Sequence, residues 1–200
     1  MYRGYRYRGR LHRDGDFWDT CVRTFFVLLF VAVAAVIFIA LTAPRGVDGA
    51  SQIFGYELRL VESDSMKEHP DTDVSAYEIG SFNKNTLVAL NLVPEDDAEA
   101  LEWYGTIKAG DVLTVRYTYD RQVTITHRVT SVEAKADGTG YIIKLQGDNL
   151  NSTATQLTQV IDTSDLSSTN YVIGKVVWKS YPVGVVIGAL QRVAKAFAGN

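Results

Sequence analysis

The chain has 200 residues, of which 46% are apolar, and it carries a net charge of −3 with three His and one Cys. This length suits one modest globular domain with a short additional segment. An acidic chain without a basic stripe is a poor match for nucleic acid. The single cysteine, Cys21, excludes an internal disulfide.

The N-terminal part combines a basic segment with an apolar run. Residues 1–23 contain six Arg and three Asp, whereas residues 24–43 (TFFVLLFVAVAAVIFIALTA) contain no charged side chain. A helix of this length covers roughly 30 Å, the thickness of the hydrocarbon core, and arginine-rich flanks stay in the cytoplasm. We therefore expect a cytoplasmic tail at 1–23, a single transmembrane helix at 24–43 and a cell-membrane location with an extracytoplasmic remainder. A cleaved signal peptide is the alternative, but its apolar stretch is typically about 7–15 residues.

Short β-strands dominate the pattern from residue 44 to residue 180. The dipeptide Asp120-Arg121 lies between two strand-like segments and predicts a hairpin, and one short helix is expected near Asp96 to Tyr104. We predict a mainly β domain, built as a small, partly open barrel. Six segments rich in Val, Ile, Thr and Tyr are the expected strands: Phe54 to Val61, Thr86 to Val93, Val112 to Tyr119, Gln122 to Val132, Tyr141 to Leu145 and Val172 to Trp178.

The C-terminal segment, residues 181–200 (YPVGVVIGALQRVAKAFAGN), is apolar for about ten residues and then carries Arg192 and Lys195. It is too short and too interrupted to be predicted as a second span. Two interpretations remain open: a segment that rests on a membrane surface, or the beginning of a further span.

Ser65 is the first candidate for chemistry, because it lies in VESDSMKEHP directly after a strand-like segment. A serine needs a base to accept its proton. His12 lies in the basic tail, and His69 is too close to Ser65 in sequence to form a good catalytic pair. His127 falls on the apolar face of a predicted strand, together with Val123, Ile125 and Val129. Such an imidazole is either a satisfied core histidine or a general base.

Asp148 is the third candidate, in LQGDNLNST after the strand that ends at Leu145. Gly-Asp-Asn is a common turn composition, and this is the simpler interpretation. The functional alternative is a carboxylate that orients an imidazole.

The ordered motifs S-D-S-M, G-D-V-L-T-V-R, T-H-R-V and G-D-N resemble those of type I signal peptidases, in the Ser-His branch found in the endoplasmic reticulum, archaea and some Gram-positive bacteria. The resemblance covers roughly residues 25–190. It implies a barrel of the signal-peptidase/LexA-like type and a serine endopeptidase that removes signal peptides from exported preproteins.

The resemblance also assigns roles to residues of this chain. It implies Ser65 as nucleophile, His127 as general base and Asp148 as the acidic partner, with oxyanion stabilisation by the Ser65 backbone N–H and by Ser63. The expected chemistry needs neither a metal nor a cofactor. An extended substrate is expected to pair with the strand edge near Leu58, Leu60 and Glu62, and the expected partners are preproteins and the lipid bilayer.

Three departures from the family's pattern leave alternatives open. Asp64 stands where the family usually has Gly, the segment 94–103 resembles an acidic insertion, and the residues after G-D-N lack the family's further acids. Asp162 or Asp165 therefore remains an alternative to Asp148. A non-catalytic β interaction module on a single-pass anchor, or an inactive signal-peptidase-like subunit, is the alternative to an enzyme.

Overall fold

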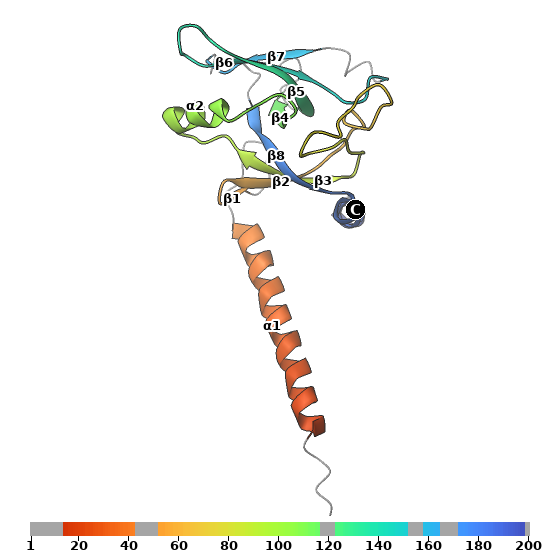
Figure 1. The fold of residues 1–200 in the computed structure, drawn as a ribbon. Helices are drawn as coiled ribbons and strands as arrows, with labels where there is room; N and C mark the ends of the chain where they lie inside the picture. The colour runs from red at the N-terminus through yellow and green to blue at the C-terminus, as the bar shows by residue number, and fades with distance from the viewer. Residues whose placement is uncertain (1–13, 43–51, 117–122, 152–157, 165–171, 199–200) are drawn as a thin grey trace, which may run out of the picture. The chain divides into compact units, whose positions relative to one another are not determined.

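The chain divides into two compact units, Met1–Ala43 and Pro44–Asn200. The computed structural model describes residues 14–42, 52–116, 123–151, 158–164 and 172–198 (Figure 1). The basic tail before residue 14, with His12, and the predicted hairpin connection Asp120-Arg121 lie outside the described residues.

The first unit contains one long helix, α1 (Asp14–Thr42). This helix begins ten residues before the expected span, within the charged segment, and Arg23 bonds to Asp19 one turn earlier at 3.1 Å. Among the described residues, no helix combines the length and the apolar character that crossing a membrane requires. The predicted transmembrane helix at 24–43, and the single-pass location in the cell membrane that depended on it, are therefore wrong.

The second unit is built on one antiparallel sheet of eight strands in the order β1-β2-β3-β8-β4-β5-β6-β7 (Figure 1). The predicted fold class, a span followed by a partly open barrel, is wrong, because the described strands follow one another from β1 to β7 in this single sheet. The strands are β1 (Gln52–Ile53), β2 (Tyr56–Leu60), β3 (Leu87–Leu92), β4 (Val112–Arg116), β5 (Thr124–Ala134), β6 (Tyr141–Gln146), β7 (Gln159–Asp162) and β8 (Val172–Ser180).

Each of the six expected strand segments overlaps an observed strand, and the expected short helix is α2 (Asp97–Gly105). The Asp96 side chain begins this helix by accepting hydrogen bonds from the backbone N–H groups of Ala98 and Glu99. The pattern missed the short strands β1 and β7 and the helix α3 (Tyr181–Ala198). A strand of two to four residues has too few positions to reveal an alternation.

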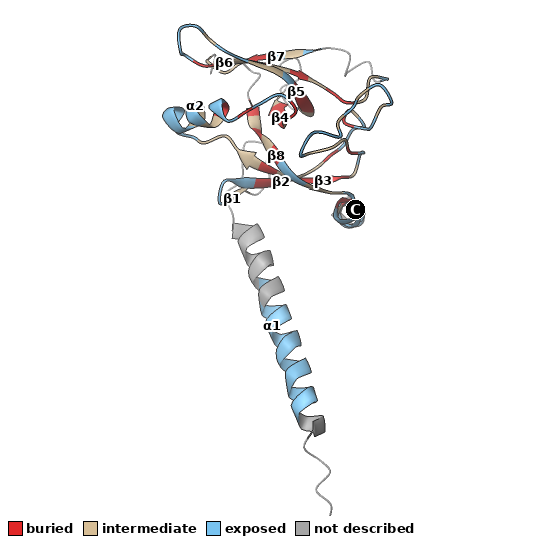
Figure 2. Cartoon of the chain, in the orientation of Figure 1, coloured by how far each residue is buried: buried red, intermediate tan, exposed pale blue. Residues whose placement is uncertain are grey.

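The core consists of two apolar clusters that lie on the two faces of the central strands. β4 contributes to both, because Val112 belongs to one cluster and Leu113 and Val115 belong to the other. Figure 2 shows the buried residues gathered on β4 and the adjoining part of β5. The strand that carries His127 is therefore held at the centre of the domain, where side chains have little freedom.

Candidate functional site

The segment that carries Ser65 leaves the end of β2 and is anchored on both sides of the serine. Val61 and Met66 are buried in the same apolar cluster, and Met66 is fully buried. The backbone N–H of Phe82 donates to the Met66 carbonyl at 2.7 Å, and the N–H of Asn149 donates to the Ser65 carbonyl at 2.9 Å. The backbone around Ser65 is thus fixed by contacts far away in sequence.

The Ser65 hydroxyl lies against the open edge of β5. Its Oγ donates to the Thr126 carbonyl at 3.4 Å and lies 3.2 Å from the Ser63 Oγ. Among the described residues, the Ser65 backbone N–H makes no hydrogen bond. The Ser63 hydroxyl and this N–H form a group of donors beside the Ser65 Oγ, which is what a developing oxyanion needs.

Asp64 does not disturb this group of donors. Its carboxylate accepts a hydrogen bond from the Lys84 backbone N–H at 2.9 Å, and its own carbonyl accepts from the Asn149 side chain at 3.0 Å. The negative side chain thus stabilises the loop around residue 84, away from the serine hydroxyl.

His127 lies on β5 opposite Leu113 of β4, and only 2% of its surface is exposed. Its Nδ1 lies 2.8 Å from the Oε1 of Gln159, the first residue of β7. Burial lowers the pKa of His127 below 6.5, and this effect is partly offset by the hydrogen bond to Gln159 and by the charge of Asp148. The imidazole is therefore neutral at pH 7 and able to accept a proton.

The structure brings Ser65 and His127 to neighbouring positions, although 61 residues separate them along the chain. The contact is made through Thr126, whose carbonyl accepts from Ser65 and whose peptide bond continues into His127. Among the described residues, no hydrogen bond joins the Ser65 hydroxyl to the His127 ring. Catalytic hydrogen bonds are often long or unaligned without substrate and shorten only when it binds.

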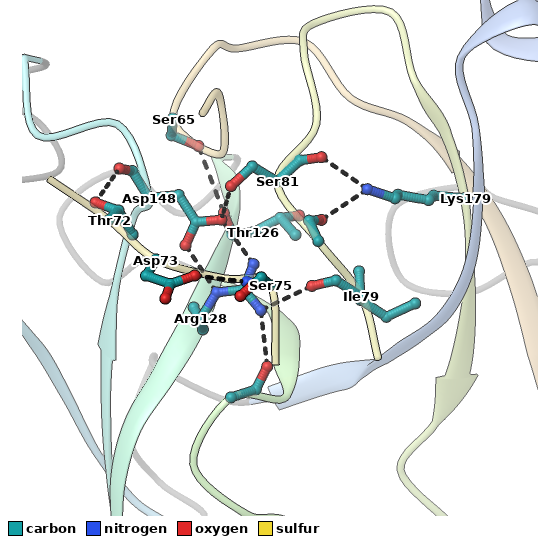
Figure 3. Close-up of polar contacts among 12 residues, drawn as sticks. Ser65, Thr72, Asp73, Ser75, Ile79, Ser81, Thr126, Arg128, Asp148 and Lys179 are labelled. Atoms are coloured by element: carbon teal, nitrogen blue, oxygen red, sulfur yellow. Dashed lines mark hydrogen bonds and ion pairs between the residues drawn. The ribbon is translucent and has the colours of Figure 1, made fainter. Parts of the chain in front are cut away.

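Asp148 is placed differently from the predicted acidic partner of His127. Both of its carboxylate oxygens are held by Arg128, at 2.8 and 2.7 Å, and Ser81 donates to the second at 2.7 Å (Figure 3). Arg128 also donates to the carbonyls of Ile79 and Gly110, both at 2.8 Å. Asp148 is thus the anion of a buried ion pair, and it influences His127 through its charge rather than by orienting the ring.

Lys179 extends this polar cluster from β8. Its ammonium donates to the carbonyls of Gly80 and Ser81, at 2.8 and 2.7 Å, and lies 5.6 Å from the centre of the Phe82 ring (Figure 3). Burial lowers the pKa of Lys179, and the nearby Arg128 acts in the same direction. Because the Lys179 ammonium donates to two carbonyls of the loop 79–82, it stabilises this loop.

Asp162 and His69, two further candidates, bond to partners other than His127. Asp162 pairs with Lys135 at 3.0 Å and accepts from Ser164, and these hydrogen bonds lower the pKa of Asp162 to about 2. Asp165 lies outside the described residues. His69 accepts from the Asp71 backbone N–H within its own loop, as expected of a loop histidine.

Among the described residues, no strand pairs with one edge of the predicted substrate strand, β2, beyond Glu57. Val61 donates to Thr86 and accepts from Asn85 on the β3 side. Since backbone groups alternate along a strand, those of Leu58 and Leu60, and of Glu62 just beyond, point away from β3. β1 pairs only with Tyr56 and Glu57, so these groups remain available to an added strand.

The side chains of β2 are arranged differently from its backbone groups. Leu58 is exposed, and Leu60 lies beside Gly188 of α3. Arg59 projects from the opposite face, where it pairs with the buried Glu57 and donates to the Thr124 hydroxyl of β5 at 3.1 Å. This contact shows that the free edge of β2 and the start of β5 are close neighbours.

β5 offers a second free edge beside Ser65. Val129 exchanges hydrogen bonds with Gly110 and Asp111 on the β4 side, so the backbone groups of Thr124 and Thr126 point the other way. β6 pairs with β5 only from Arg128 onward. The Ser65 hydroxyl contacts Thr126 on this edge.

Sequence reasoning missed Gln159 and the role of Arg128. Gln159 begins a four-residue strand. Nothing in the sequence distinguishes a glutamine that hydrogen-bonds to a histidine from a glutamine on the surface. Arg128 was visible beside His127, but its partner became known only when Asp148 was placed.

A scan of the chain against protein-family models finds no match, and a search of the curated proteins finds none either.

Proposed function

We propose that this protein is a serine endopeptidase that removes signal peptides from preproteins, with Ser65 as nucleophile and His127 as general base. One observation carries the proposal. The Ser65 hydroxyl lies 3.4 Å from the carbonyl that precedes a buried, neutral imidazole, and the order of the serine and histidine motifs resembles that of signal peptidases.

In the proposed reaction, His127 accepts the proton of Ser65 while the serine oxygen attacks the carbonyl carbon of the scissile bond. The oxyanion that forms is stabilised by the Ser65 N–H and the Ser63 hydroxyl. His127 then gives its proton to the leaving amine, and water resolves the acyl-enzyme by the reverse sequence of proton transfers. The reaction requires the Ser65 hydroxyl to leave the Thr126 carbonyl and to come within hydrogen-bonding distance of the His127 ring.

The substrate chain lies extended between the free edges of β2 and β5. Main-chain hydrogen bonds to Leu58, Leu60 and Glu62 on one side and to Thr126 on the other support this position. Recognition through main-chain groups tolerates different substrate sequences, which suits an enzyme that acts on many preproteins.

Cleavage of a signal-peptide-bearing preprotein by the purified full chain tests the proposal. Ser65→Ala and His127→Ala are each expected to reduce cleavage at least about 10³-fold, because a nucleophile and its base act as one unit. Ser75→Ala and His69→Ala are the matched controls, since Ser75 is exposed and His69 bonds only within its own loop. Both controls should keep the wild-type rate.

The alternative is a non-catalytic interaction module or an inactive signal-peptidase-like subunit. The missing hydrogen bond between Ser65 and His127 among the described residues favours it. A wild-type protein that binds the preprotein without cleaving it, or that cleaves equally well after Ser65→Ala, would establish this alternative.

A further inference from the structure

Gln159 occupies the position around His127 that an acidic residue was expected to fill. Its strand β7 pairs with β6, where Gln159 lies opposite Leu145, and Leu145 in turn lies opposite Val129 of β5. Val129 and His127 share a face of β5, because they are two positions apart along the strand. The glutamine side chain thus reaches the imidazole across the end of β6.

The chemistry of this contact selects one tautomer of His127. The Oε1 of an amide only accepts hydrogen bonds, so the Nδ1 that lies 2.8 Å from it must carry the proton. A neutral imidazole with its proton on Nδ1 has its lone pair on Nε2. The Nε2 is then the atom that accepts a proton from an incoming hydroxyl.

The carboxylates of Asp148 and Asp64 are bound to other groups, so Gln159 is the residue that fixes the His127 ring. Asp148 is held by Arg128 and Ser81, and Asp64 directs its carboxylate at the Lys84 N–H. The residue opposite His127 on β4 is the apolar Leu113, and the apolar Leu145 of β6 lies opposite Val129, on the same face as His127. An amide partner fixes the ring without the negative charge that a carboxylate would add.

We infer that Gln159 is the positioning residue of His127, holding the imidazole as the Nδ1–H tautomer with Nε2 directed to accept a proton. The hydrogen bond itself is independent of catalysis, and its catalytic meaning rests on the proposed function. A neutral positioning residue stabilises the imidazolium less than a carboxylate does, so a wild-type site of this kind keeps its base neutral to lower pH.

The test is NMR spectroscopy of the full chain with ¹⁵N-labelled histidine. The chain contains only three histidines, so few signals have to be assigned. At pH 7.5, the spectrum of the wild type is expected to show His127 with the proton on Nδ1. Gln159→Leu should remove this fixed tautomer. Gln159→Glu should raise the pKa of His127 by about 1 to 3 pH units, because it places a negative charge beside the ring. The exposed Gln191 supplies the control, since Gln191→Glu should change neither the tautomer nor the pKa of His127.

A proton on Nε2 in the wild type, or a His127 titration that is the same in the wild type and in Gln159→Glu, would overturn the inference. The first readout needs no variant, so it holds if Gln159→Leu fails to fold. In the preprotein assay, Gln159→Glu should move the acid midpoint of kcat/KM upward with the pKa of His127. An Nδ1–H tautomer in a protein that cleaves nothing would support the position of Gln159 and reject the proposed function.

Discussion

At the scale of single residues, the environment of His127 decides when the base is available. The imidazole is almost fully buried, and burial lowers the pKa of His127 below its ordinary value of 6.5. A base with a lowered pKa keeps its neutral form to lower pH than an ordinary imidazole, and it is lost as the pH falls through the lowered value.

We therefore predict that the acid limb of kcat/KM for preprotein cleavage has its midpoint below pH 6.5, the ordinary pKa of an imidazole. The acid limb should follow one proton, because one imidazole is the base. The pH profile of cleavage under first-order conditions measures this directly. A midpoint above pH 7, or a profile that stays flat to pH 4, would be incompatible with His127 as the base.

Ser65 and His127 could be proposed as candidate residues from the sequence for physical reasons. Ser65 follows a strand, and His127 falls on the apolar face of an alternating segment, where a polar ring needs an explanation. The acidic partner was not recognisable, because the choice between Asp148 and its alternatives depends on which side chains meet in space. Arg128 lies on the opposite face of β5 from His127, and it forms the ion pair with Asp148.

At the scale of elements, the helix α3 depends on close approach between backbones. A Cβ on Gly184 would meet the backbone of Asn85 and Leu87 at the start of β3. One on Gly188 would meet side-chain atoms instead, the end of Leu60 at 3.3 Å and the Asn85 Oδ1 at 3.9 Å. Rigid backbone cannot yield as a flexible side chain can.

Gly184→Ala is therefore expected to destabilise the domain by about 1–3 kcal/mol. Gly188→Ala is the matched control in the same helix, and it should be neutral or stabilising by up to about 1 kcal/mol, because alanine favours the helix. Urea denaturation of both variants measures the difference in free energy of unfolding. Equal effects would mean that α3 does not pack on β3 through Gly184.

The elements with clear periodicity were predicted, and those whose formation depends on neighbours were not. β5 alternates over many residues, and α2 begins with Asp96, a strong helix-capping residue. β7 contributes only four residues and pairs with β6 alone. The sequence of α3 allowed two membrane interpretations, but glycine contacts with β3 and Leu60 hold this helix against the sheet.

At the scale of the whole molecule, a buried ion pair joins three distant parts of the chain around the site. Arg128 comes from β5, Asp148 follows β6, and the carbonyl of Ile79 belongs to the loop that also supplies Ser81 (Figure 3). Asn149, next to Asp148, binds the backbone of the Ser65 segment. The Arg128–Asp148 ion pair therefore maintains the position of Ser65 relative to β5.

Asp148→Asn is expected to destabilise the protein by about 3–5 kcal/mol, because it leaves the buried Arg128 charge without its counterion. Glu102→Gln, at an exposed position on α2, should change the free energy of unfolding by less than about 0.5 kcal/mol. Chemical denaturation monitors both. If Asp148→Asn abolished cleavage and left stability unchanged, Asp148 would be a catalytic residue rather than a structural anion.

The larger errors of the sequence analysis concerned the whole molecule. The apolar content of residues 24–43 favoured a span, but α1 starts in the charged segment, and no described helix meets the requirements for crossing a membrane. Six of the eight described strands were predicted, yet their order in the sheet was not predictable, because β8 inserts between β3 and β4 from the far end of the chain. Such long-range pairing leaves no local signal.

The central claim is that Ser65 is a nucleophile activated by His127, and covalent labelling tests it most directly. A peptide phosphonate diphenyl ester with a small residue at the reactive position transfers its phosphonyl group to an activated serine, with loss of phenol. Mass spectrometry of the full chain should locate this group on Ser65, and His127→Ala should slow the labelling at least about 10³-fold. Labelling at another serine, no labelling, or a rate that does not change after His127→Ala would contradict the account.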